Sequence, residues 1–176
     1  GFHLIPSQPE LSLVEVTLIN SLSRERVLAG LLGDVAPNYD YVLIDCNPSL
    51  GLLVINALTA ADSVLIPSQT EYLAARGALM ILSTIETIRR KRLNPSLQIE
   101  GILLTMADTR TSLTRDIQAA VAQQYGHGMR IFNTVIRRSV RFAESAAAGR
   151  SLIAYDPRSA GANAYRAVAR ELGITN

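Results

Sequence analysis

The stretch YVLIDCNPSLG, residues 41–51, ends an apolar run with an acid and continues into a short polar loop. Pro48 and Gly51 predict a turn in that loop, before the next helical pattern begins. A carboxylate in this setting can hold a magnesium-bound water while the loop contacts a γ-phosphate. The alternative is that Asp45 only ends a strand or caps the following helix, and the local pattern fits both interpretations.

The phosphate-binding loop that would complete such a site has the pattern G-x-x-x-x-G-K-[ST], in which the lysine reaches the β- and γ-phosphates. The only lysine of the chain, Lys91, lies in IRRKRLN, away from any pair of glycines. The sequence therefore contains no Walker A motif. Because it also begins at Gly1 rather than at a methionine, we expect a fragment of a longer protein.

Other residues with reactive side chains give weaker signals. Cys46 follows the acid, but neither His3 nor His127 is near it in sequence, so we expect a buried, inert thiol rather than a nucleophile. Neither histidine has a second ligand at helical or strand spacing, which predicts no structural metal site.

Arginines are concentrated in the later part of the chain. Residues 1–71 carry 2 basic and 8 acidic side chains, a net −6, whereas residues 72–176 carry 15 basic and 7 acidic ones, a net +8. Five of these arginines lie in strand-end loops or at adjacent helix starts and could form one face: Arg110, Arg115, Arg137, Arg138 and Arg141. Because no aromatic residues lie between them, such a face would bind phosphates rather than stack on bases. The alternative is a solvated surface, and the RRKR run at 89–92 also fits a basic helix end.

The elements that must position these residues follow from the apolar patterning. The chain has 176 residues with 48% hydrophobic content, enough for a single domain over residues 1–176, and no apolar run reaches the roughly 20 residues that span a bilayer. Residues 10–35 have helical spacing with a break near residues 21–23. Strand-length runs then alternate with helical patterns: YVLID, GLLVINALTA, SVLIP, a helix over about 74–93, IEGILLTM, a helix near 111–125, RIFNTVI and two further helical stretches.

Continuously apolar strands separated by helices predict an α/β fold with a mostly parallel sheet flanked by helices. Ligands of such sheets bind beyond the carboxyl ends of the strands. The polar residues after four of the runs, at 45–49, 67–71, 106–110 and 137–141, are therefore expected to converge on one edge.

Four segments of the chain closely resemble the ParA/Soj family of chromosome and plasmid partitioning ATPases. They are YDYVLIDCNPSLGLLVINAL, ADSVLIPSQTEY, IEGILLTMADTRTSL and YDPRSAGANAYRAVAREL. The resemblance covers residues 4–172. It implies a deviant P-loop NTPase fold of the SIMIBI type, truncated at its amino terminus, so that the chain is the carboxy-terminal portion of such an ATPase. In this family, ATP and magnesium drive formation of a dimer that binds DNA without sequence specificity, and a ParB/Spo0J-type partner stimulates hydrolysis.

The resemblance also implies roles for individual residues. Asp45 matches the Walker B acid, which acts on magnesium through water, and Asn47, Pro48, Ser49, Leu50 and Gly51 match the second switch. Met106, Ile136 and Arg137 fall where the family lines its adenine pocket. Arg110 and Arg141 match arginines implicated in DNA binding, and Arg115 and Arg138 lie close to them in sequence.

Several positions depart from the family pattern. Asn47 replaces a proline of the switch, Ala107 and Ser112 replace a tyrosine and an asparagine, and Arg137 replaces a proline beside the adenine site. We expect a cytoplasmic, nucleoid-associated protein that forms a homodimer or a higher association and does not bind membranes. Without the phosphate-binding loop, we expect this chain to bind ATP and magnesium poorly and not to hydrolyse ATP by itself. The alternative function is a non-enzymatic ParA-like interaction protein that dimerises with an intact ParA or binds its partner.

Overall fold

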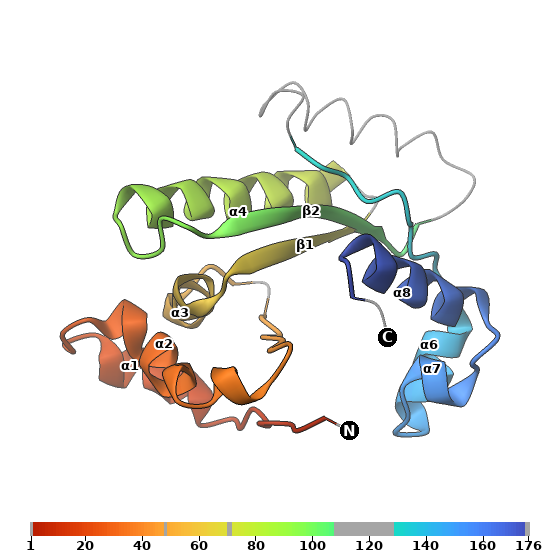
Figure 1. Cartoon of the computed structure of the whole chain (residues 1–176), viewed down its shortest axis with the longest axis horizontal. Coiled ribbons are helices and arrows are strands. Elements are labelled where there is room, and N and C mark those ends of the chain that lie inside the picture. The colour runs from red at the N-terminus through yellow and green to blue at the C-terminus, as the bar shows by residue number, and fades with distance from the viewer. Residues whose placement is uncertain (1, 48, 70–71, 108–128, 175–176) are drawn as a thin grey trace. The chain divides into compact units, whose positions relative to one another are not determined.

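The computed structural model describes residues 2–47, 49–69, 72–107 and 129–174 (Figure 1). Within these ranges the chain groups into two compact units, residues 1–63 with 83–98 and residues 64–82 with 99–176. The elements, in chain order, are α1 (Leu11–Leu18), the 3-10 helix η1 (Arg24–Arg26), α2 (Val27–Gly33), the 3-10 helix η2 (Ala36–Asn38), α3 (Leu52–Ala60), β1 (Ser63–Gln69), α4 (Tyr72–Arg90), β2 (Gln98–Thr105), α6 (Val140–Ala147), α7 (Leu152–Tyr155) and α8 (Ala160–Glu171).

The first unit is helical, and two buried asparagines connect its elements. Asn56 on α3 donates to the carbonyl of Arg24 in η1 at 2.8 Å and accepts from the amide of Leu28 in α2 at 3.1 Å. Asn94, which follows α4, donates to the carbonyl of Leu58 in α3 at 3.0 Å. Buried side-chain amides that satisfy backbone groups of neighbouring helices fix how those helices meet.

The helical pattern over residues 10–35 is interrupted where the sequence predicts. Ser23 has a φ of 55°, in the left-handed region, and separates the end of α1 from η1 and α2. A left-handed residue cannot continue a right-handed helix, so the pattern forms two α-helices instead of one.

The second unit contains a small parallel sheet. β1 and β2 are hydrogen-bonded neighbours, and the amide of Gln98 at the start of β2 donates to the carbonyl of Asp62 just before β1, at 3.0 Å. The strands therefore start together and run in the same direction, with α4 as their crossover. On the other side of β2 the RIFNTVI segment is parallel to it through two isolated bridges, from Ile102 to Ile131 and from Ala107 to Arg137 (Figure 1).

Helices cover both faces of this sheet. Leu103 of β2 packs in a buried cluster with Phe132, Ile136 and Val168, and Val168 lies on α8. The residues on either side of Leu103 point to the opposite face by strand alternation and are also fully buried. The sheet thus has the two covered faces that its continuous apolar strands predict, and the α/β fold class is confirmed.

The prediction of a buried strand at residues 41–45 is wrong for this structure. No strand is assigned there, and Tyr41, Val42 and Leu43 expose 59%, 43% and 89% of their surfaces. A strand is defined by hydrogen bonds to a neighbour, and no backbone hydrogen bond joins residues 41–45 to another described residue. The apolar sequence is typical of a central strand, but no neighbouring strand is present beside it in the described ranges.

Candidate nucleotide and phosphate-binding residues

Asp45 lies in the first unit, in an exposed loop between η2 and α3. In the same loop Ser49 donates its hydroxyl proton to the side-chain oxygen of Asn47 at 3.2 Å, which closes a local turn. Pro48 lies outside the described residues. The carboxylate of Asp45 is therefore open to solvent, where it can bind a hydrated cation, and no group of three or more potential metal ligands exists within the described ranges.

Glu15, which sequence reasoning did not single out, closes the end of this loop. Its Oε1 accepts from the amide of Leu53 at 3.1 Å, in the first turn of α3, and a Cβ built on Gly51 would collide with the same carboxylate. A carboxylate at a helix N-terminus satisfies a free amide and interacts favourably with the helix dipole. The absence of a side chain at Gly51 gives Glu15 the space to do so.

Cys46 is exposed rather than buried, so that part of the prediction is wrong. Partial loss of hydration and the neighbouring Asp45 carboxylate raise the pKa of the Cys46 thiol. A raised pKa disfavours the thiolate, which is the nucleophilic form, so the environment of Cys46 agrees with an inert thiol.

Met106, Ile136 and Arg137 come together in the second unit, beyond the carboxyl end of β2. The amide of Ala107 donates to the carbonyl of Ile136 at 3.2 Å, and Ala107 pairs with Arg137. Met106 has a φ of 50° and exposes 51% of its surface. A left-handed methionine is an uncommon conformation that costs free energy, and such residues concentrate at ligand sites.

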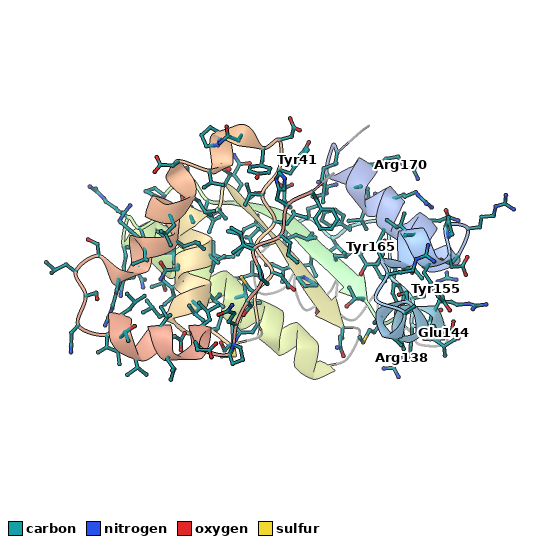
Figure 2. All side chains as sticks on the ribbon, turned by 90° about the horizontal axis from the view of Figure 1, so that it is seen from below. Tyr41, Arg138, Glu144, Tyr155, Tyr165 and Arg170 are labelled. Carbon is teal, nitrogen blue, oxygen red and sulfur yellow. The ribbon has the colours of Figure 1, made fainter. Side chains whose placement is uncertain are left out.

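The arginines of the predicted phosphate-binding face differ in their surroundings. Arg110 and Arg115 lie outside the described residues. Arg137 and Arg138 are exposed, and no hydrogen bond or ion pair to another described residue involves their guanidinium groups. Figure 2 shows the side chain of Arg138 pointing away from the ribbon beside α6. Neither cation therefore has to leave a described partner in order to contact a polyanion.

Arg141 is different because it already has acidic partners. Its Nη1 lies 2.9 Å from Oε2 of Glu144, one turn along α6, and its Nε lies 3.6 Å from Oδ2 of Asp156, which follows α7. The hydrogen bond to Glu144 and the charges of both carboxylates raise the pKa of Arg141. Arg141 remains fully charged, but a phosphate would have to compete with two carboxylates for it.

The predicted site residues are divided between the two units. Asp45 and its loop are in the first unit, and the candidate base-binding and DNA-binding residues that the structure describes are in the second: Met106, Ile136, Arg137, Arg138 and Arg141. The convergence of the strand ends on one edge therefore stays a prediction. Within the second unit, the structure does bring Met106 beside Ile136 and Arg137. Among the helices in the described part of the chain, none is long and apolar enough to cross a membrane.

The chain matches a family model described as an AAA domain over residues 1–99. It is 46% identical over 172 residues to the sporulation initiation inhibitor protein Soj of Bacillus subtilis, a match that covers 98% of this chain and 67% of that protein. It is 43% identical over 170 residues to the chromosome partitioning protein ParA of Myxococcus xanthus, covering 97% of this chain and 59% of that protein. The curated relatives are longer, and the chain covers 53% to 67% of their lengths.

A solved structure has a similar fold. Cobyrinic acid a,c-diamide synthase from Mycobacterium smegmatis, crystallised with ADP and magnesium, superposes with a TM-score of 0.75 at 35% identity, covering 94% of this chain and 60% of that one. The agreement in sequence along nearly the whole chain, together with the α/β architecture, assigns the relationship. The chain belongs to the ParA/Soj family of partitioning ATPases.

Proposed function

We propose that the chain is the Walker B-bearing portion of a DNA-segregation ATPase. In the whole protein, ATP and magnesium would drive formation of a dimer that binds DNA without sequence specificity and responds to a ParB-type partner. The observation that carries the proposal is the 46% identity to Soj over 172 residues, because that match includes every segment with a candidate site residue.

In this proposal Asp45 holds magnesium through a water molecule, and residues 47–51 form the switch that responds to the γ-phosphate. Met106, Ile136 and Arg137 surround the nucleotide base. The exposed, strained backbone at Met106 and its proximity to Ile136 support a ligand position there. The DNA-binding face consists of Arg110, Arg115, Arg138 and Arg141.

ATP hydrolysis needs a phosphate-binding lysine that these 176 residues do not supply, because Lys91 follows directly after α4 and no glycine-rich loop surrounds it. We therefore expect the purified 176-residue chain, its length confirmed by intact mass, to turn over ATP at the background rate. Asp45→Asn is the matched control, since any contaminating ATPase would persist in it unchanged. Turnover comparable to that of an intact relative, lost in Asp45→Asn, would contradict this expectation.

The DNA-binding part of the proposal is tested by releasing Arg141 from its carboxylate partner. Glu144→Gln removes the charge 2.9 Å from the guanidinium, so a DNA phosphate competes with one carboxylate fewer. Because the ion pair is exposed, its loss should have a modest effect, an increase in DNA affinity of about two- to fivefold. Fluorescence anisotropy with a random-sequence DNA duplex at low salt measures this change.

Glu10→Gln is the matched control for that experiment, because it removes the same charge from an exposed side chain in the first unit. It changes the net charge by the same amount but does not remove a partner of Arg141, so its DNA affinity should stay within about twofold of the parent. Equal affinities for the parent, Glu144→Gln and Glu10→Gln would mean that Arg141 does not contact DNA.

A second candidate function is a non-enzymatic protein that dimerises with an intact ParA. It is favoured because the only lysine of these 176 residues, Lys91, lies outside every glycine-containing loop and so cannot bind the phosphates of ATP as a Walker A lysine does. Exposed apolar residues at 41–43 offer such a partner an unpaired segment. Size-exclusion chromatography of this chain mixed with an intact relative separates the two functions. A stable mixed complex that forms without ATP would favour the interaction protein, and separate elution would favour the ATPase portion.

A further inference from the structure

The RIFNTVI segment does not keep one register along β2. Between the two bridges, β2 and the two residues after it advance by five residues, from Ile102 to Ala107. The segment advances by six, from Ile131 to Arg137. A regular parallel pair advances equally on both strands, so extra residues leave the ladder between the bridges. This irregularity lies next to the proposed position of the nucleotide base.

The hydrogen bonds show where the extra residues are. The amide of Phe132 donates to the carbonyl of Ile102 at 3.0 Å, so a regular ladder would next join the amide of Thr134 to the carbonyl of Leu104. That carbonyl instead accepts from the amide of Ile136 at 2.9 Å, two residues later. The segment therefore bulges by two residues opposite the end of β2. The left-handed Met106, directly after β2, adds one residue on the other side, so that the net difference between the bridges is one residue.

The amides released by this bulge bind to Glu171, the last residue of α8. The amide of Thr134 donates to Oε1 of Glu171 at 2.8 Å, and the amide of Asn133 donates to Oε2 at 3.0 Å. The hydroxyl of Thr134 also donates to Oε1, at 2.5 Å. One carboxylate thus takes the place of the ladder partner that Thr134 has lost.

A carboxylate at this position needs such partners. The C-terminal end of a helix carries partial negative charge, so Glu171 at the end of α8 opposes the helix dipole. The three donors offset that repulsion. Arg130 does so as well, because its Nη2 donates to the backbone carbonyl of Glu171 at 2.8 Å and lies 3.9 Å from Oε2. The side chain of Glu171 is 19% exposed, so water competes little for these contacts.

We propose that Glu171 is a positioning residue that fixes the two-residue bulge of segment 130–138 and thereby places Ile136 and Arg137 beside Met106. The significance of that placement for nucleotide binding rests on the proposed function above. Without the carboxylate, the amide of Thr134 can return to the carbonyl of Leu104. The segment opposite Leu104 would then shift by about two residues, or roughly 7 Å, along β2. Arg137, which is one residue beyond the regular register at Ala107, would also leave its place beside Met106.

A shift of two residues is also the smallest that leaves the core intact. A slip of one residue would exchange the two faces of the segment and turn the buried Ile136 outward, whereas a slip of two retains the same face. The alternation of side chains between the two faces therefore does not by itself select between the regular and the bulged register. A contact outside the core must select between them, and Glu171 provides that contact.

Amide hydrogen exchange, resolved residue by residue by NMR at pH 7, tests this role in Glu171→Gln. The loss of Glu171 allows the bulged and the regular register to interconvert, and each interconversion breaks the hydrogen bonds of the segment. We therefore expect the amides of Asn133, Thr134, Ile136 and Arg138 to exchange at least tenfold faster than in the parent. The amide of Phe132, which precedes the bulge, should keep its protection and also reports that the variant is folded. Glu171→Asp, whose carboxylate is withdrawn by one methylene group, should give the same pattern and serves as the second variant.

Arg170→Gln is the matched control, because it alters the adjacent exposed residue at the same helix end. Its exchange rates should equal those of the parent. If both Glu171 variants accelerate only Asn133 and Thr134, Glu171 caps two amides without setting the register, and the proposal is overturned. Unchanged rates at all four amides overturn it as well.

These measurements need no nucleotide, so they remain valid if the proposed function fails. A separate titration of the parent with Mg-ATP reports on that function through the NMR shifts of Met106, Ile136 and Arg137. Shifts at these residues would support the base site, whereas their absence at millimolar ATP would count against the base site and leave the register result standing.

Discussion

Three arginines near the start of α6 look equivalent in the sequence IRRSVR but are not equivalent in the structure. Arg137 and Arg138 are exposed, whereas Arg141 contacts Glu144 and Asp156. The pair with Glu144 is predictable, because residues three apart on a helix are neighbours. Asp156 lies fifteen positions away, and only the packing of α6 and α7 brings it close.

Glu171 makes the stability of the second unit depend on pH. Hydrogen bonds from Thr134 and Asn133, together with the charge of Arg130, hold the pKa of Glu171 below the ordinary value for a glutamate. A carboxyl whose pKa is lower in the folded than in the unfolded protein contributes stability above the unfolded value. That contribution is lost as the pH falls through the folded pKa.

We therefore expect Glu171→Gln to lower the free energy of unfolding by about 1–2 kcal/mol at pH 7, because a charged acceptor of three hydrogen bonds becomes neutral. The difference between parent and variant should shrink below the ordinary glutamate pKa and vanish once Glu171 is protonated in the folded chain. Urea unfolding at pH 7 and at intervals below pH 5 measures this difference. A constant difference at every pH would show that the loss comes from packing and not from the charge.

At the scale of elements, the sequence predicts those whose partners are local. The alternation of helical and strand patterns matches α3, β1, α4 and β2, because strand and crossover helix form from adjacent segments. The prediction fails at residues 41–45, since a strand also needs a neighbour and apolar content cannot supply one. The two-residue bulge of segment 130–138 was not predictable either, because its amides bind to Glu171, which is more than thirty residues away in the sequence.

Gly101 tests the close approach of segment 130–138 to β2. It has a φ of 138°, and a Cβ at this position would lie 2.6 Å from the backbone carbonyl oxygen of Arg130. Gly101→Ala should therefore lower the free energy of unfolding by about 1–3 kcal/mol, through strain and separation of the strands.

Gly30→Ala is the control for this substitution, because Gly30 lies within α2 and nothing is within 4 Å of its added Cβ. Alanine has the higher helix propensity, so this variant should be at least as stable as the parent. Thermal unfolding of the two variants compares them directly, and equal stability of Gly101→Ala and parent would show that the strands do not approach this closely.

At the scale of the whole molecule, charge is distributed unevenly along the chain. Residues 1–71 have a net charge of −6 and residues 72–176 one of +8. A uniformly mixed surface would repel and attract a polyanion about equally, whereas a concentrated positive region can bind phosphates despite a total charge of only +2. Sequence identity establishes the family, and the structure establishes the fold. DNA binding by the positive region is a proposal, and it needs a direct measurement.

The most direct measurement is the salt dependence of affinity for a random-sequence DNA duplex, compared among the parent, Arg138→Ala, Arg141→Ala and the control Arg170→Ala. The affinity of the parent for DNA should fall steeply as the salt concentration rises. Arg138→Ala and Arg141→Ala should each weaken binding and reduce the slope of log affinity against log salt by about one. Arg170→Ala removes the same charge at the end of α8 and should leave the slope unchanged. Identical slopes for all four proteins, or binding that does not respond to salt, would contradict the proposed DNA-binding face.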